Sequence, residues 1–206
     1  MQNHHYIIAL LWIIWCTIHS FLASDTVNQW IQSKPGRYPN YFRLFYNLLA
    51  GISLAPVLWY GRLFEPQIIF HFTGVWTVLQ IILVGIAIFF FWSGAREYDL
   101  AYFSGLRQIK FDEKASVESV NLSTAGILQI TRHPWYTGGI IFIWCYDGQL
   151  SLSGIISDTI ISIYFIIGAK LEEKKLVKNF GSQYTEYQDK VSMLIPFKWI
   201  KSKFKK

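Results

Sequence analysis

Five long apolar runs divide the chain, and polar or charged segments separate them. A bilayer core requires a helix of about 20 apolar residues, within a range of roughly 17 to 25. The first, second, third and fifth runs meet this length, and the fourth run is shorter. The runs are Tyr6–Ala23, Leu44–Tyr60, Ile68–Trp92, Tyr136–Leu150 and Leu152–Ala169. The pattern predicts an all-α, polytopic membrane protein with five transmembrane helices, the last two of which form a tight helical hairpin that turns at residues 151–154.

The order of the runs predicts a single integral-membrane domain over residues 1–206. Residues 1–92 hold three N-terminal spans, residues 93–135 form a cytoplasmic loop, and residues 136–206 form the C-terminal hairpin and a cytoplasmic amphipathic tail. Within the loop, apolar residues three apart in residues 98–111 suit a helix that lies on the membrane surface, and a polar stretch follows.

The tail contains two further predicted features. The fifth run continues as a helix as far as Gly181, a residue type that commonly ends helices. Tyr184, Tyr187 and Val191 then mark one face of a short amphipathic helix, which Pro196 is expected to end. The last residues are basic and aromatic, which is typical of a membrane contact.

Charge fixes the predicted orientation. The chain has 206 residues, of which 52% are hydrophobic and 16% charged, and its net charge is +6. The basic residues flank the apolar runs, so the solvated basic face that a nucleic-acid-binding protein needs is missing. Of the 19 Lys and Arg residues, all but Arg62 fall on one side of the five-span arrangement. The positive-inside rule then places the N-terminus outside and the C-terminus in the cytoplasm.

Two further observations narrow the class. No Lys or Arg precedes the first run, so that run is interpreted as a retained span and not as a secretory signal peptide. Cys16 and Cys145 both lie inside apolar runs, without the spacing of a disulfide framework or a metal site. We therefore predict no metal and two small buried thiols.

The segment Arg132-His133-Pro134 begins the fourth run. Proline suits the first turn of a helix, and the N-terminus of a helix carries partial positive charge. Two cationic side chains at that end are unfavourable unless an anion binds there. Gly138 and Gly139, one turn later, permit close approach by a ligand or by a neighbouring helix. The alternative is that Arg132 and His133 are only flanking charges and the glycines only a packing seam.

Glu172 and Glu173 lie at the cytoplasmic end of the fifth run. They could be solvated flanking charges paired with nearby lysines. In a tight hairpin, however, the ends of the fourth and fifth runs must be neighbours. Cationic and anionic groups would then meet in one pocket at the membrane surface, rimmed by Tyr136, Tyr184 and Tyr187. Such a pocket suits a zwitterionic ligand that carries an aromatic ring.

The two motifs resemble those of a known family. RHPWYTG at residues 132–138 and EEKKLVKNFGSQYTEYQDKVSMLIPF at residues 172–197 are similar to the RHPxYxG and EExxLxxxFGxxYxxYxxxVxxxxPF patterns of the isoprenylcysteine carboxyl methyltransferase superfamily of integral-membrane methyltransferases. In the N-terminal half, HSFLAS at residues 19–24 and SGLRQ at residues 104–108 resemble the bacterial methanethiol S-methyltransferase and NnrU-like branch.

The resemblance implies that S-adenosylmethionine binds at the cytoplasmic end of the last two spans, so that residues 136–206 form a catalytic hairpin and tail. It also implies a multi-pass protein of a bacterial inner membrane. The residues carried over to the cofactor site are Gln129, Arg132, His133, Tyr136, Gly138, Glu172, Glu173, Tyr184 and Tyr187. The chemistry agrees, because Arg132 or His133 can bind a carboxylate and a glutamate can accept from ribose hydroxyls or an amino group.

The expected activity is transfer of a methyl group to the sulfur of a small or lipophilic thiol. Arg132 is a candidate catalytic residue because a positive pocket raises the thiolate fraction of the acceptor. His19 is the second candidate, because ionisable residues inside membrane spans are often functional; the alternative for His19 is a hydrogen-bonded packing role. Asp158 is expected to be structural. No GxGxxG motif or strand–helix alternation is present, which excludes a soluble Rossmann-type methyltransferase.

Three functions remain open. The first is S-methylation of a thiol. The second is carboxyl methylation of a prenylcysteine-like substrate or N-methylation of a lipid amine. The third is a non-enzymatic membrane protein or transporter of the NnrU kind. A transporter would be expected to place paired charges near the middle of the membrane, whereas the charged residues of this chain gather at the cytoplasmic ends of its runs.

Overall fold

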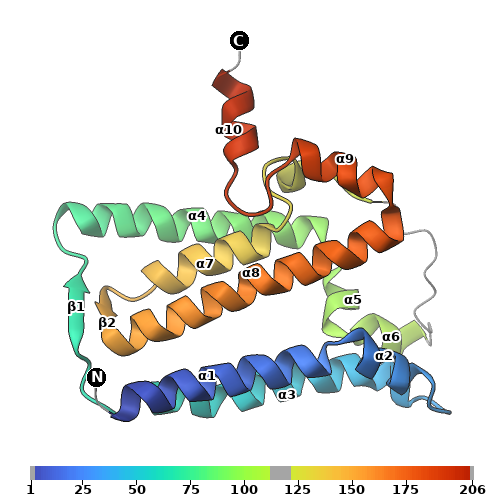
Figure 1. Ribbon diagram of the computed structural model, residues 1–206, viewed down its shortest axis with the longest axis horizontal. Coiled ribbons are helices and arrows are strands. Elements are labelled where there is room, and N and C mark those ends of the chain that lie inside the picture. Colours follow the sequence, from blue (N-terminus) through green and yellow to red (C-terminus); the bar gives the residue numbers. More distant parts are fainter. Residues whose placement is uncertain (1–2, 112–121, 205–206) are drawn as a thin grey trace. The chain divides into compact units, whose positions relative to one another are not determined.

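The computed structural model describes residues 3–111 and 122–204, which form helices and one small sheet (Figure 1). The chain divides into two compact units. Of the described residues, the first contains 3–67, 99–111 and 152–160, and the second contains 68–98, 122–151 and 161–204. Helix α8 (Leu152–Phe180) begins in the first unit and continues through the second.

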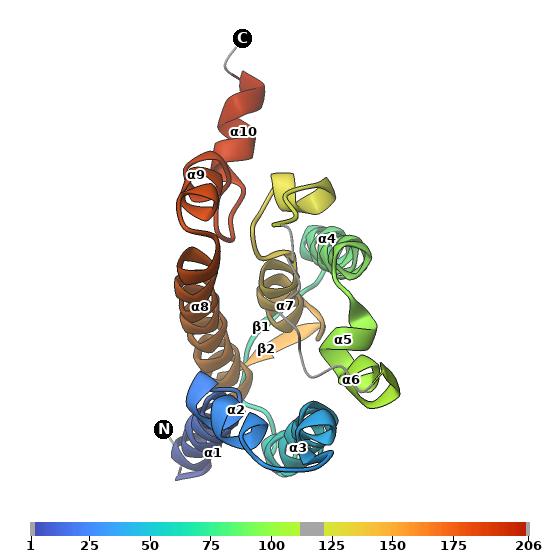
Figure 2. The same cartoon turned by 90° about the vertical axis from the view of Figure 1, so that its right-hand side faces the viewer.

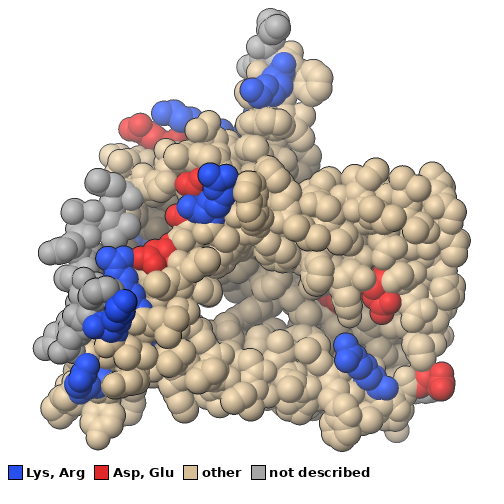
Figure 3. Space-filling model, turned by 180° about the vertical axis from the view of Figure 1, so that it is seen from behind, with Lys and Arg blue, Asp and Glu red and all other residues tan. Residues whose placement is uncertain are grey.

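Four helices are long and apolar enough to cross a bilayer: α1 (Asn3–Leu22), α3 (Tyr38–Gly61), α4 (Val75–Glu97) and α8. Large apolar side chains on these helices face outward. On α4, Val75 is 76% exposed and Ile81 is 66% exposed, and the broad face of α4 in Figure 3 carries almost no charge. Exposed apolar surface of this extent marks contact with lipid. The expected helical membrane protein is therefore confirmed in outline.

In the first unit, α1 packs against α3, and α2 (Asp25–Gln32) connects them. Two short helices, α5 (Leu100–Ser104) and α6 (Leu106–Phe111), lie against α3. Arg43 donates through Nε to the carbonyl of Phe103 at 3.1 Å, and Asn47 donates to the same carbonyl at 3.1 Å. These bonds satisfy the C-terminal carbonyl groups that α5 leaves unpaired.

In the second unit, α7 (Pro134–Cys145) lies between α4 and the later part of α8 (Figures 1 and 2). Glycines on α7 permit this packing on both sides. A Cβ at Gly138 would lie 3.0 Å from the Ala87 carbonyl oxygen, and one at Gly139 would lie 2.8 Å from the ring of Phe165. Both are closer than ordinary contacts, so α7 approaches its neighbours more closely than a larger residue allows.

We expect Gly138→Ala to destabilise the fold by about 1–3 kcal/mol, because the added methyl group meets the Ala87 carbonyl oxygen and the Phe90 Cβ, each at 3.0 Å. Gly85→Ala, on the neighbouring helix α4, is the matched control, since nothing lies within 4 Å of its added Cβ. Reversible unfolding in detergent measures both variants. Equal stability of the two variants would contradict close packing of α4 on α7.

The fold is mostly helical, as predicted, but it includes one small sheet that the sequence did not predict. Strand β1 (Ile68–His71) pairs antiparallel with β2 (Gln149–Ser151), and Phe70 faces Leu150 in the register. β-branched and aromatic residues favour extended pairing, and Gly74, at φ +58°, separates β1 from α4. The run Ile68–Trp92 is therefore not one helix.

The tight helical hairpin is also corrected. α7 ends at Cys145, and β2 lies between it and α8, so the turn at residues 151–154 does not exist. Gln80 donates to the carbonyls of Cys145 at 2.8 Å and Asp147 at 3.1 Å, which holds the chain as it leaves α7. With 12 residues, α7 is only about 18 Å long, and the predicted count of five transmembrane helices stays a prediction.

Two local predictions also change. The expected surface helix in residues 98–111 is broken at Gly105, where φ is +90° and a Cβ would lie 2.6 Å from the backbone nitrogen of Leu44. Pro196 does not end the amphipathic helix α9 (Ser182–Lys190) but precedes a further helix, α10 (Phe197–Phe204). Most of the predicted polar loop lies outside the described residues. The end of α8 before Gly181, and α9 itself, are confirmed.

Candidate functional site

A buried ion pair joins the two sequence motifs within the second unit. Arg132 lies just before α7, and Glu173 lies on α8. Arg132 Nε donates to Glu173 Oε1 at 2.6 Å, and the two side chains are 8% and 10% exposed. The prediction that the RHP and EE segments meet is confirmed. Burial makes this pair sensitive to the loss of either partner, because the remaining charge would be left without compensation.

Arg132 also holds the end of α9. Its Nη1 lies 3.1 Å from the carbonyl oxygen of Gln188 and also contacts the carbonyl of Val191. The last carbonyl groups of a helix have no partner within the helix, and a cation there is favoured by the helix dipole. Arg132 therefore ties α8 and α9 to the start of α7. In the described part of the chain, its Nη2 makes no hydrogen bond.

Glu173 is fully engaged by its neighbours. Besides Arg132, His133 Nε2 lies 3.2 Å from Oε1, and Gln188 Nε2 donates to Oε2 at 2.9 Å. Sequence reasoning missed Gln188. The signal was available, because Gln188 follows Tyr184 by four residues and so shares its face of α9.

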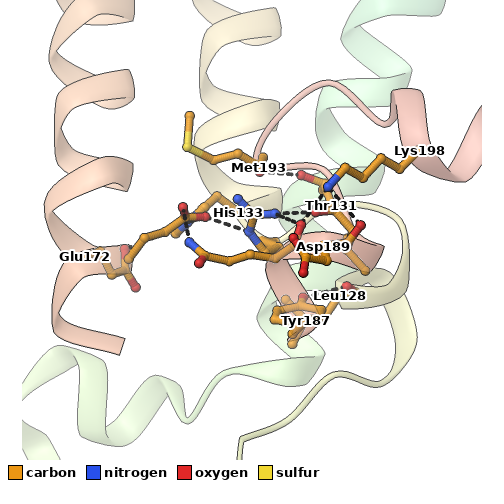
Figure 4. A network of polar contacts seen from close by, with 12 residues as sticks. Leu128, Thr131, His133, Glu172, Tyr187, Asp189, Met193 and Lys198 are labelled. Carbon is orange, nitrogen blue, oxygen red and sulfur yellow. Dashed lines mark hydrogen bonds and ion pairs between the residues drawn. The ribbon is translucent and has the colours of Figure 1, made fainter. Parts of the chain in front are cut away.

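Glu172 is placed differently from Glu173. Its side chain is 48% exposed, and His133 Nδ1 lies 3.7 Å from its Oε2, which is an ion-pair distance and too long for a hydrogen bond. Figure 4 shows Glu172 at the edge of the network, on the opposite side of His133 from Thr131. Tyr136 and Tyr98 both interact with the Glu172 carboxylate. Glu172 is thus the carboxylate of this site that remains open to a ligand.

A strap formed by residues 191–194 holds the start of α7 in place. Thr131 and Ser192 form a parallel β-bridge, and the backbone N–H of Arg132 donates to the Ser192 carbonyl at 3.0 Å. Thr131 is fully buried, and its hydroxyl donates to the Met193 carbonyl at 2.8 Å. The Thr137 hydroxyl lies 3.2 Å from the Leu194 carbonyl. Figure 4 shows Met193 of this strap next to His133, whose backbone N–H donates to the Met193 carbonyl at 3.2 Å. The sequence analysis did not predict it.

Tyr184 and Tyr187 form the core beneath the site and not its open rim. They are 1% and 8% exposed and pack with Phe90, Ile127 and Leu128. The Tyr187 hydroxyl donates to the Leu128 carbonyl at 2.6 Å. Burial raises the pKa of Tyr187 to about 12 and also raises the pKa of Tyr184. Both phenols therefore stay neutral near pH 7, and Tyr187 acts as a hydrogen-bond donor.

The remaining predicted residues lie apart from this network. Gln129 is exposed in η1 (Gly126–Gln129), and its side chain makes no hydrogen bond to the described residues. Gly138 packs against α4, which favours the packing interpretation of that glycine. His19 lies in the first unit, where its Nε2 is 2.7 Å from the Tyr46 hydroxyl and its ring stacks on Trp15.

The predictions about cysteine and metal can also be compared with the structure. Cys16 and Cys145 are buried and free, as expected. Among the described residues, no group of three or more His, Cys, Asp or Glu side chains could hold a metal ion.

A groove of about 440 Å³ lies between α4 and η1. Phe89, Trp92 and Ile130 give it an apolar lining, and Arg96 and Glu97 stand at the polar part. Glu97 is the sequence neighbour of Tyr98, which interacts with Glu172. The groove and the polar network thus share the end of α4.

Comparison with known proteins links these residues to one family. The model of a family described as NnrU protein matches residues 7–172. A methanethiol S-methyltransferase from Pseudomonas deceptionensis is 27% identical over 195 residues, which cover 91% of this chain and 71% of that protein. A methanethiol S-methyltransferase from Crocosphaera subtropica is 34% identical over 95 residues, covering 45% of this chain but only 36% of that protein.

A second group of relatives carries a different name. Protein-S-isoprenylcysteine O-methyltransferase B from Arabidopsis thaliana is 36% identical over 84 residues, which cover 39% of this chain and 42% of that protein. No solved structure matches the chain significantly.

Proposed function

Because the chain belongs to the NnrU family, we propose that it is a membrane methyltransferase that uses S-adenosylmethionine to methylate the sulfur of a small or lipophilic thiol. The observation that carries the proposal is the meeting of Arg132, His133, Glu172 and Glu173 in one network. The names of the methanethiol S-methyltransferases, one of which matches over 91% of this chain, support the reaction.

The residues of the network fit the chemistry of this cofactor. S-adenosylmethionine carries a carboxylate, an ammonium group, ribose hydroxyls and an adenine ring, and when bound it supplies an activated methyl group. Glu172, with a half-exposed carboxylate, can accept from an ammonium group or a ribose hydroxyl. Arg132 can offer Nη2 to a carboxylate while Nε and Nη1 keep their partners. Tyr136, next to His133, can cover a ring or a cation.

The other residues of the network hold these groups in position. Glu173 and Gln188 fix Arg132 and His133, and the strap fixes the backbone before α7. Orientation is the main contribution that a protein makes to an in-line methyl displacement, where alignment alone can supply roughly 7–11 kcal/mol. A thiol with a pKa near 8.5 needs only a modest positive field to increase its reactive thiolate fraction. In this proposal His19 remains a candidate for the acceptor side.

Carboxyl methylation of a prenylcysteine-like substrate is the second candidate, and one observation favours it. The isoprenylcysteine methyltransferase of Arabidopsis matches at 36% identity, although over only 39% of this chain. The apolar groove lined by Phe89 and Trp92 would suit a lipophilic acceptor in either reaction. N-methylation of a lipid amine uses the same donor and needs no separate site.

Two measurements on the purified protein test the proposal. Calorimetry should detect S-adenosylmethionine binding, and absence of binding would favour a non-enzymatic membrane protein. Tritiated cofactor, offered with methanethiol, longer thiols, prenylcysteines and lipid amines, should label thiols fastest. Labelling of prenylcysteine alone would replace the first candidate with the second.

We also propose that the N-terminus lies outside, that the C-terminus lies in the cytoplasm, and that the protein resides in a bacterial inner membrane. Residues 134–151 begin beside Glu173 and end next to Leu152, so helix α7 and strand β2 together span the same distance as residues 152–173 of α8. A C-terminal green fluorescent protein fusion should therefore fluoresce, and a C-terminal alkaline phosphatase fusion should be inactive. The reverse pattern would rule out this topology.

A further inference from the structure

The last helix, α10, has an apolar edge surrounded by lysines. Phe197 is 66% exposed, Ile200 is 40% exposed and Phe204 is 83% exposed, and their spacing places them on one side of the helix. None of the residues of α10 is buried within the described chain. Lysines 198, 201 and 203 lie around this edge. A helix with this pattern is typical of those that lie at the boundary between lipid headgroups and acyl chains.

The direction of α10 agrees with such a position. In Figures 1 and 2, α10 stands across the common direction of α4, α7 and the second-unit part of α8. Because α4 and α8 are candidate membrane spans, a helix that lies across them runs parallel to the membrane plane, as a helix at the membrane surface does.

We propose that α10 binds the surface of an anionic lipid leaflet. The apolar edge would enter the acyl boundary, and Lys201 and Lys203 would meet the negative headgroups. Nucleic acid would pair with the lysines but leave Phe197, Ile200 and Phe204 in water, so the combination favours lipid. The spans of the same chain keep the bilayer adjacent, and each lysine near an anionic surface strengthens binding by about fivefold.

The structure also connects α10 to the candidate site. Lys198 Nζ donates to the carbonyls of Gln188 at 2.7 Å and Asp189 at 2.9 Å, and the Lys198 N–H donates to the Ser192 hydroxyl at 3.0 Å. The Gln188 carbonyl is also a partner of Arg132. Lipid that holds α10 at the membrane surface therefore stabilises the end of α9 and the strap. From this we infer, on the basis of the proposed function, that anionic lipid strengthens cofactor binding.

The position of α10 can be tested without the cofactor. A spin label is attached to Phe204→Cys, on the apolar edge, or to Ser202→Cys, on the opposite side, in full-length protein in which Cys16 and Cys145 are replaced by Ala. In liposomes with phosphatidylglycerol, the label at 204 should be accessible to oxygen and the label at 202 to an aqueous nickel reagent. Equal aqueous accessibility of both labels, or oxygen accessibility at 204 that is unchanged in purely zwitterionic liposomes, would overturn the proposal.

Charge variants then test the link to the site. Lys201→Glu with Lys203→Glu should move the label at 204 into water and weaken S-adenosylmethionine binding roughly fivefold. Gln at both positions should give a smaller change in the same direction, and it avoids the helix-end repulsion of the Glu variant. Lys174→Glu with Lys178→Glu, exposed on α8, is the matched control and should leave the label unmoved.

The outcomes separate the two proposals. A label at 204 that stays in lipid in the Lys201→Glu, Lys203→Glu protein would overturn the role of charge. Cofactor affinity that is independent of lipid composition, with the label positions as expected, would overturn only the link. A protein that binds no cofactor but shows the expected label positions would refute the proposed function and leave the lipid contact standing.

Discussion

Glu173→Gln should destabilise the protein by about 3–5 kcal/mol, the usual cost of removing one partner from a buried ion pair. The carboxylate accepts from Arg132 and Gln188 and faces His133. An amide keeps the shape of the side chain but removes the charge and replaces one accepting oxygen with a donor. Arg132 would then be left as a buried cation without compensation. Reversible unfolding in detergent without cofactor measures the loss.

Glu172→Gln is the matched control, because it makes the same chemical change one residue earlier. The Glu172 side chain is 48% exposed, and exposed pairs contribute only about 0–1 kcal/mol. We expect near-parental stability in Glu172→Gln but cofactor binding at least about tenfold weaker, since one charge-assisted hydrogen bond is lost. If both variants keep parental stability, Glu173 is not a structural partner. If Glu172→Gln binds as tightly as the parent, Glu172 does not face the ligand.

Much of the site could be predicted from the sequence because its parts are local. RHPWYTG and the EE segment are contiguous motifs, and the resemblance to the methyltransferase families that they supported is confirmed by the family match and the relatives. The meeting of the two segments followed from the order of the apolar runs. Helix α9 followed from the spacing of Tyr184 and Tyr187.

The roles within the site could not be read from the same pattern. Glu172 and Glu173 are adjacent and chemically identical, and only the rotation of α8 decides which one is buried. The strap depends on backbone groups of residues 131 and 192, which any sequence carries. A parallel bridge between segments 61 residues apart leaves no periodic signal. Strands β1 and β2 were hidden for a related reason, since short apolar runs do not distinguish strand from helix.

Arg132→Lys is expected to keep the membrane topology, because the charge is retained, but to lose about 2–3 kcal/mol of stability. A lysine ammonium can still reach Glu173, but it lacks the planar fork that lets Arg132 contact Glu173, Gln188 and Val191 together. Hydrogen bonds that involve a charged group contribute about 1.5–3 kcal/mol each. Arg96→Lys, in which an exposed arginine lies over the ring of Trp92, is the control and should change stability by less than about 0.5 kcal/mol.

Combining Arg132→Lys with Glu173→Gln separates a partnership from two independent effects. Residues in one buried network show coupling of about 0.5–3 kcal/mol, so the double variant should lose less stability than the two single losses added together. Titration of S-adenosylmethionine into Arg132→Lys should also show binding weakened by at least about tenfold, because the end of α9 and the start of α7 are no longer held together. Additive stability losses with unchanged affinity would mean that Arg132 is a flanking charge, and that the cationic start of α7 serves only the orientation of the chain in the membrane.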